Sequence, residues 1–223
     1  MMRWPHYTRA WIYASTISNM GVLAKRDSVF LAKLLIWLFA LGYCIYLIGG
    51  IFADYLGANP IEAITHQTGE WGLHFLLASL SISTLRRRLY WNQLQKLRRL
   101  LGLWSFAFIV LHFFTFIFFD HFFYLPSIIE DVVDRPYITV GFAAFLLLIP
   151  LAVTSTRGFQ RSLGKYWLRL HRLVYGVAIL GILHYWWLVK ADSLYPLIYS
   201  FILLLLFAER LFWRLQKRAH SVK

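Results

Sequence analysis

Histidine side chains lie inside or at the edge of long apolar runs of this sequence, where an ionisable group is energetically costly. His112 lies within the apolar run 98–119, and His184 lies within the run 168–189, which has His171 at its basic end. A histidine at membrane depth is by default a functional candidate, and imidazole nitrogens are common axial ligands of haem iron. The alternative for any one of them, including His74 in a shorter apolar run, is a hydrogen bond between helices.

The spacing predicts two imidazoles at matching depth if both runs are helices that cross in the same direction. His112 lies about twelve residues beyond the basic end of its run, which is about 18 Å at 1.5 Å per residue. His184 lies about 20 Å beyond His171 by the same rise. Arg98, at the basic end of the first run, shares a helix face with His112. Two histidines at one level are what a haem with two axial imidazoles requires.

The second run is less regular than the first. His171 and His184 are about 140° out of phase in a straight helix. Either this helix departs from ideal geometry or the two histidines approach their ligands from different sides. Gly176 and Gly181, which lie between them, make a local distortion plausible.

The composition indicates an integral membrane protein. The sequence is 60% hydrophobic and 15% charged, and its apolar runs of about twenty residues can each cross a hydrocarbon core. The single cysteine, Cys44, cannot form an internal disulfide or hold an iron–sulfur cluster. The sequence has no C-x-x-C-H motif for covalent haem attachment, and no glycine-rich motif or domain for a nicotinamide cofactor.

The formal charge of +13 follows the topology of a membrane protein and does not indicate nucleic-acid binding. Of the 23 Lys and Arg residues, 20 cluster in four blocks, and eight of the ten acids lie in the segments between alternate pairs of spans. Basic loops mark the cytoplasmic side. We therefore predict an all-α bundle of six transmembrane helices with both termini in the cytoplasm. The predicted parts are a cytoplasmic or interfacial tail (1–28), the bundle (29–213) and a basic cytoplasmic tail (214–223).

Two local predictions concern the segments around the second span. Asn59 suits a helix N-cap, with Pro60 at the first helical position and Glu62 completing a capping box, so a short helix is predicted to end at Gly69. The second span is then predicted at 71–85, followed by an interfacial cytoplasmic helix at 86–99.

Several motifs resemble those of a known family. They are RRLLGLW, the LHFF around His112, RPYIT, TSTRGFQRSLGKYWLRLHRLVY and ILHYWW. Over about residues 54–213 the sequence is similar to the haem-binding membrane subunits of bacterial periplasmic methionine-sulfoxide reductase systems. These belong to the ferric-reductase-like transmembrane superfamily.

The resemblance implies a set of cofactors and site residues. His112 and His184 would be the axial ligands of an outer haem b, and His171 would be one ligand of an inner haem. The fourth histidine of the superfamily pattern falls at Arg98, so the inner iron could be five-coordinate or unusually ligated. Alternatively the inner haem is absent, with Arg98 binding a propionate or a flavin phosphate. The resemblance also implies FMN, for which the sequence offers no recognisable site.

The same resemblance implies a function and partners. The chain would be an electron-transfer subunit in the bacterial inner membrane, not a catalyst on its own. It would take electrons from quinol or a cytoplasmic flavin reductase and pass them to a periplasmic molybdenum-containing subunit that repairs oxidised methionines. Two alternatives are a free-standing ferric or cupric reductase and a haem-free transporter with histidine relays.

Overall fold

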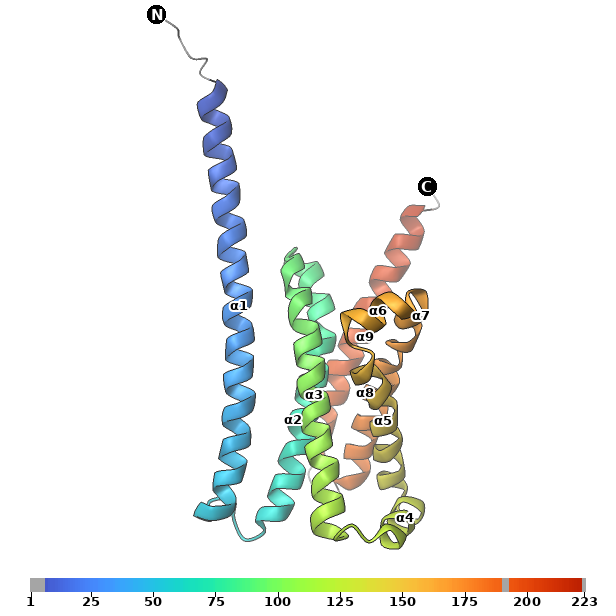
Figure 1. Cartoon of the computed structure of the whole chain (residues 1–223). Helices are drawn as coiled ribbons and strands as arrows, with labels where there is room; N and C mark the ends of the chain where they lie inside the picture. The colour runs from blue at the N-terminus through green and yellow to red at the C-terminus, as the bar shows by residue number, and fades with distance from the viewer. Residues whose placement is uncertain (1–6, 190–192, 222–223) are drawn as a thin grey trace, which may run out of the picture.

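The computed structural model describes residues 7–189 and 193–221, with side chains placed over 27–189 and 193–219. All regular structure in these residues is helical (Figure 1). Six long helices are α1 (Tyr7–Ala53), α2 (Pro60–Arg88), α3 (Gln95–Thr115), α5 (Pro136–Val153), α8 (Leu173–Leu188) and α9 (Leu194–Ser221). The shorter elements are the 3-10 turn η1 (Asn92–Leu94), the π-helical turn η2 (Phe116–Asp120), α4 (Leu125–Asp134), α6 (Arg157–Leu163) and α7 (Lys165–Leu170).

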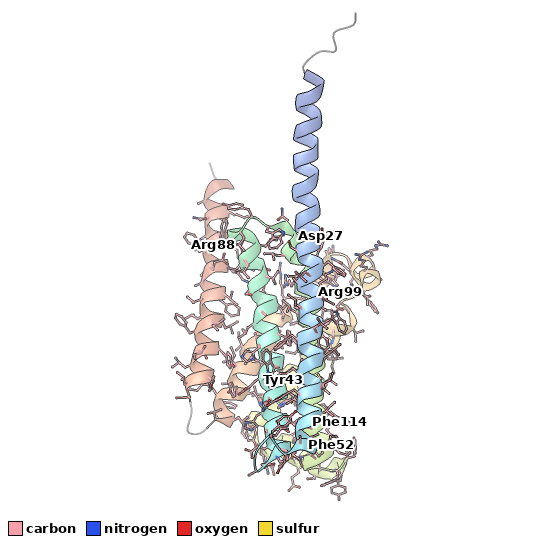
Figure 2. All side chains as sticks on the ribbon, turned by 90° about the vertical axis from the view of Figure 1, so that its left-hand side faces the viewer. Asp27, Tyr43, Phe52, Arg88, Arg99 and Phe114 are labelled. Atoms are coloured by element: carbon pink, nitrogen blue, oxygen red, sulfur yellow. The ribbon has the colours of Figure 1, made fainter. Side chains whose placement is uncertain are left out.

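The long helices run antiparallel to their neighbours in sequence, as Figure 1 shows, with α4 at one end of the bundle and α6 and α7 at the other. We call the first the α4 end and the second the arginine end. The arginine end is labelled by Arg88 and Arg99 in Figure 2, and the opposite end by Phe52 and Phe114.

Five segments of the described chain are long and apolar enough to cross a membrane. They are Asp27–Ala53, Asn92–Asp120, Pro136–Val153, Lys165–Leu188 and Leu194–Ala219. These correspond to five of the six predicted spans. The remaining one, the second span predicted at 71–85, lies within α2. This helix has 29 residues but carries Glu62, Glu70 and three arginines.

The beginning of α2 confirms the predicted N-cap and corrects the predicted end of the helix. The backbone N–H of Glu62 donates to Asn59 Oδ1 at 3.2 Å, and Asn59 Nδ2 donates to Glu62 Oε2 at 2.9 Å. The helix does not end at Gly69, because α2 continues without a break to Arg88. Gly69 here allows the close approach of a neighbouring helix, described below.

The connection between α2 and α3 differs from the prediction of an interfacial helix at 86–99. Arg86, Arg87 and Arg88 form the last turn of α2, where cations are favourable because helix C-termini carry partial negative charge. A short turn and η1 follow, and α3 already includes Arg98 and Arg99.

The helix carrying His171 and His184 is interrupted. His171 caps the C-terminus of α7, and α8 begins only at Leu173. The predicted departure from ideal geometry therefore exists, but it lies at His171–Arg172 and not at Gly176 or Gly181. The 140° phase difference calculated for a straight helix does not apply to this segment.

Both predicted tails continue helices of the bundle as far as they are described. Residues 7–28 are the N-terminal part of α1, which extends beyond the other helices in Figure 1, and residues 214–221 belong to α9. Residues 1–6 and 222–223 of these tails, and residues 190–192 of the predicted turn before the last span, lie outside the described residues.

Two apolar clusters hold the helices together. One joins α2, α5, α8 and α9 through residues such as Leu80, Leu148 and Ala178. The other joins α1 to α2 and α3 through Phe75, Phe108 and Ala40. Many large apolar side chains on the outside of α1 and α9 are exposed, as expected for surfaces in contact with lipid.

Candidate functional site

The structure brings the rings of His112 of α3 and His184 of α8 next to each other inside the bundle, in an edge-to-face arrangement. Their ring centroids are 6.1 Å apart, and the ring planes make an angle of 75°. The side chains reach this point from two helices that run in the same direction, so their similar distances from the basic ends put them at one level.

The imidazole of His112 is seated on the backbone of α2. His112 Nδ1 lies 2.8 Å from the carbonyl oxygen of Thr65. One helical turn further, a Cβ on Gly69 would lie only 3.0 Å from the same nitrogen. Gly69 therefore leaves the space that the ring occupies.

The imidazole of His184 is seated on α5 in the same way. His184 Nδ1 lies 2.6 Å from the carbonyl oxygen of Tyr137, and a Cβ on Gly141 would lie 2.7 Å from that nitrogen. In both cases the carbonyl precedes the histidine by 47 residues, and the glycine follows the carbonyl by one turn. The α2–α3 and α5–α8 pairs thus repeat one local arrangement.

This seating determines what the rings can bind. A backbone carbonyl only accepts hydrogen bonds, so each Nδ1 must carry the proton and donate it. Each Nε2 then keeps its lone pair for a metal ion, as in metal-ligating histidines held by an outer hydrogen bond. An imidazole nitrogen lies about 2 Å from a transition metal, so two rings on opposite sides of one ion have centroids roughly 6 Å apart.

The observed separation of 6.1 Å fits two axial ligands of one haem iron. Among the described residues, no group of three or more His, Cys, Asp or Glu side chains is placed to hold a metal ion. Two axial nitrogens are what the protein must add to an iron that already has four porphyrin nitrogens.

A cavity of about 920 Å³ surrounds the two rings, within the usual range for a bound cofactor. Its inner walls are mainly apolar and include Phe113, Phe145, Leu148 and Val177. Near α4 the lining becomes polar. It includes His66, Asp120, His121, Ser127, Asp131 and Arg135.

Among the described residues that line the cavity, Arg135 is the only arginine or lysine, and it lies at the polar mouth. Its Nη1 donates to the hydroxyl of Tyr137 at 3.5 Å, and its Nε lies 3.2 Å from Asp131 Oδ1. The Tyr137 hydrogen bond, followed by the Asp131 carboxylate, raises the pKa of Arg135, so the guanidinium stays charged. The mouth therefore carries this positive charge together with the Asp131 carboxylate that pairs with it.

Two polar side chains of α2, Glu70 and His74, make hydrogen bonds to other helices. The hydroxyl of Tyr185 donates to Glu70 Oε1 at 2.8 Å, and both residues line the cavity. His74 does not line the cavity, and its Nε2 lies 2.8 Å from the hydroxyl of Tyr199 on α9. The interpretation of His74 as a contact between helices agrees with this geometry.

His171 and Arg98 lie apart from the cavity around His112 and His184. The ring of His171 stacks on Trp167 with centroids 3.9 Å apart, and its Nδ1 lies 3.2 Å from the Trp167 carbonyl oxygen. Arg98 Nη1 donates weakly to Ser83 Oγ at 3.4 Å. The structure therefore brings together two of the four residues singled out from the sequence.

Sequence reasoning did not identify the four residues that seat the histidines: Thr65, Gly69, Tyr137 and Gly141. The only signal in the sequence was that the carbonyl residue precedes its histidine by 47 residues in both cases. This equality can be interpreted only once it is known that α2 packs on α3 and α5 on α8.

Comparison with known proteins shows the family of the chain. Residues 66–182 match the model of the family described as the ferric reductase like transmembrane component, a region that includes His112 and His171. A protein of Herminiimonas arsenicoxydans is 56% identical over 171 residues, which cover 75% of this chain and 78% of that protein. It is named as the haem-binding subunit MsrQ of protein-methionine-sulfoxide reductase. The chain belongs to the MsrQ family.

Other MsrQ subunits match over most of their length. The subunit of Rhodospirillum rubrum is 50% identical over 206 residues, covering 89% of this chain and 95% of its own. That of Xanthomonas campestris is 41% identical over 205 residues, covering 92% and 94%. No solved structure matches the chain.

Proposed function

We propose that this member of the MsrQ family is a transmembrane b-type cytochrome with His112 and His184 as the axial ligands of a haem. The observation that carries the proposal is the 6.1 Å separation of two imidazoles whose Nδ1 atoms both face backbone carbonyls. The relatives' name, which describes a haem-binding subunit, supports it. When bound, the haem iron would supply one-electron redox chemistry.

The chain's own residues would position and insulate the haem. The carbonyls of Thr65 and Tyr137 fix the tautomer and orientation of the two rings. Phe113, Phe145 and the other apolar lining residues exclude water. Arg135 at the polar mouth has the charge to bind a propionate.

The direction of electron transfer follows from topology. We infer that α2 crosses the membrane with the five apolar segments, because it is long enough and packs along α3. The arginine end then faces the cytoplasm, and the α4 end faces the periplasm. Electrons from quinol or a cytoplasmic flavin reductase would reach a periplasmic molybdenum-containing reductase subunit. The relatives belong to a methionine-sulfoxide reductase, which supports such a partner.

The acidic outer segment is a candidate docking surface for that partner. This segment runs from Asp120 to Asp134 and includes α4. Glu130 and Asp134 are exposed there, whereas Asp131 pairs with Arg135. Charge complementarity would steer association with a basic surface.

An inner haem at His171 and Arg98 remains a proposal from the resemblance. His171 lies at the break between α7 and α8, where its Nδ1 again approaches a backbone carbonyl. FMN is likewise implied by the resemblance alone.

Substitution of the two paired histidines tests the proposal. Purified His112→Ala and His184→Ala variants are expected to lose most of their haem, because each lacks one of two axial ligands. They should also fail to support methionine-sulfoxide reduction with the periplasmic subunit. His74→Ala is the matched control, since this intramembrane histidine bonds Tyr199 outside the cavity and should leave the haem in place.

Full haem content in both variants would overturn the ligand assignment. Wild-type protein that reduces a ferric chelate rapidly without a partner would favour a free-standing reductase. A complete lack of Soret absorbance after haem-replete expression would favour the transporter hypothesis.

A further inference from the structure

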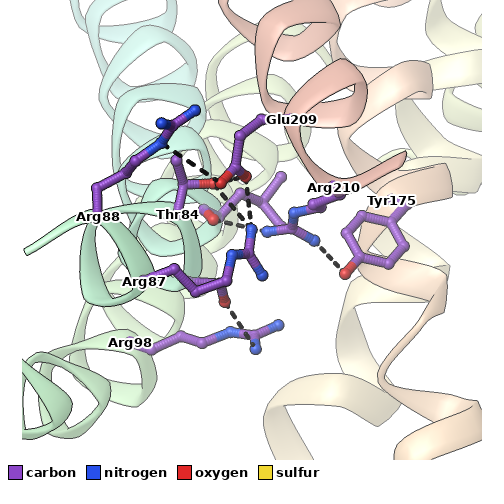
Figure 3. A network of polar contacts seen from close by, with 9 residues as sticks. Thr84, Arg87, Arg88, Arg98, Tyr175, Glu209 and Arg210 are labelled. Carbon is purple, nitrogen blue, oxygen red and sulfur yellow. Dashed lines mark hydrogen bonds and ion pairs between the residues drawn. The ribbon is translucent and has the colours of Figure 1, made fainter. Parts of the chain in front are cut away.

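Three arginines from three helices converge at the arginine end of the bundle, as Figure 3 shows. They are Arg87 of α2, Arg98 of α3 and Arg210 of α9, and we call them the arginine triad. Arg87 and Arg98 both lie close enough to Arg210 to repel its charge. Such a cluster of partly buried cations is unfavourable unless anions compensate it.

The carboxylate beside the triad, Glu209, is already engaged. Its Oε2 accepts from Arg87 Nη2 at 2.5 Å and from Thr84 Oγ1 at 2.7 Å. Its Oε1 lies 4.0 Å from Nε of Arg88, an arginine at the rim of the cluster. Glu209 therefore neutralises one cation of the triad at most.

The other two arginines of the triad have neutral partners. Arg210 donates to the hydroxyl of Tyr175 and, at 2.6 Å, to the carbonyl oxygen of Leu80. Arg98 has the 3.4 Å contact with Ser83. Within residues 27–189 and 193–219, neither guanidinium lies within 4 Å of a carboxylate. The buried Nε atoms of Arg87 and Arg210 also have no hydrogen-bond partner in the described part of the chain.

We propose that the arginine triad binds the phosphate group of a ligand at the cytoplasmic surface of the membrane. Guanidinium groups match phosphate oxygens in charge and in planar, forked geometry. Basic pockets between transmembrane helices on this side are suited to acidic lipid headgroups. A soluble phosphomonoester would present the same group.

This inference does not depend on the haem at His112 and His184. The triad does not line that cavity, and Arg87 and Arg98 adjoin Arg88 and Arg99 at the arginine end (Figure 2). The Soret absorbance of the haem at His112 and His184 therefore serves as a separate readout for a folded protein, and a failed phosphate site leaves that haem in place. A loss confined to a second, inner haem would assign Arg98 to the site at His171 and overturn its role in the triad.

The test compares two double variants of the full chain in detergent. Arg98→Gln with Arg210→Gln removes two members of the triad. Arg99→Gln with Arg214→Gln removes the same charge from exposed positions on the same two helices. Native mass spectrometry then measures binding of phosphatidylglycerol, with phosphatidylcholine as the zwitterionic comparison.

We expect the triad variant to bind phosphatidylglycerol about 30-fold more weakly than wild type, at roughly 1 kcal/mol for each basic residue. The control variant should bind like wild type. Equal losses in both variants would overturn the proposal, because they would indicate a general attraction to the basic surface. Equal binding of phosphatidylcholine and phosphatidylglycerol to wild type, with no loss of either in the triad variant, would overturn it too.

A second arm separates the two sources of phosphate. Inorganic phosphate and FMN are added to delipidated wild-type protein, and the unfolding temperature is recorded. Stabilisation that is lost only in the triad variant would assign the site to a soluble phosphate compound. No specific effect of lipid, phosphate or FMN would refute the site.

Discussion

At the scale of single residues, one backbone carbonyl and one glycine on each of α2 and α5 determine where the imidazoles can lie. They are Thr65 and Gly69 for His112, and Tyr137 and Gly141 for His184. A side chain on Gly69 or Gly141 would meet Nδ1 of His112 or His184 at 3.0 or 2.7 Å. These glycines therefore act as positioning residues, whereas Gly42 and Gly176 face open space.

Substitution of these glycines should disturb the haem site. We expect Gly69→Ala and Gly141→Ala to displace the rings, at roughly 1–3 kcal/mol of overpacking, with the larger effect at Gly141. Haem content and reduction potential of the purified variants measure the displacement. Gly102→Ala, whose Cβ would meet Ser79 Oγ at an ordinary 3.6 Å, is the control. Identical potentials in all three variants would show that the glycines do not position the rings.

The sequence was informative about these histidines because depth along a helix follows directly from residue count. The matching depth of His112 and His184 was calculated from rise alone, and their ring centroids do lie 6.1 Å apart in the structure. Their role as ligands stays a prediction. The seats were beyond sequence reasoning, because nothing local marks Thr65 or Tyr137 as a hydrogen-bond partner 47 residues from its histidine.

At the scale of helices, the lengths of the apolar runs predicted most of the spans. The ends of the helices, which were placed at polar residues and glycine, were predicted less well. Gly69 was interpreted as a helix end and the basic stretch 86–99 as a separate interfacial helix. In the structure α2, which packs on α3, is continuous from Pro60 to Arg88. Ser105 Oγ donates to the carbonyl oxygen of Gly72, and Ser79 Oγ donates to that of Arg98. Tertiary contacts of this kind override local helix propensity.

The crossing of α2 can be tested by labelling single cysteines. In a Cys44→Ser background, Ala58→Cys lies between α1 and α2, and Asn92→Cys lies between α2 and α3. A membrane-impermeant maleimide should label Ala58→Cys from the periplasm and Asn92→Cys only in inverted vesicles. Labelling of both positions from one side would mean that α2 does not cross.

The ion pair between α2 and α9 should contribute to the stability of the bundle. Glu209→Ala would leave the Arg87 guanidinium without its carboxylate, and side-chain exposures of 26% for Arg87 and 11% for Glu209 imply little compensation by water. We expect a loss of about 1–3 kcal/mol. Thermal unfolding in detergent measures it against Glu130→Ala, an exposed carboxylate on α4. Equal unfolding temperatures for the two variants would contradict this role of the pair.

At the scale of the whole molecule, the repeated α2–α3 and α5–α8 pairs enclose one cavity that opens toward α4. The arginine triad lies at the opposite end, where Figure 2 labels the neighbouring residues Arg88 and Arg99. A membrane protein with this polarity can accept electrons on one side and release them on the other. That account depends on a haem between His112 and His184.

The most direct test is a pair of absorption spectra of the detergent-purified wild-type protein, oxidised and dithionite-reduced, with pyridine haemochrome quantification. We predict a low-spin b-type spectrum with at least one haem per chain, as expected for an iron with two axial imidazoles. A second haem per chain would support the inner site at His171. Protein without haem after haem-replete expression, or with only high-spin five-coordinate haem, would contradict the account.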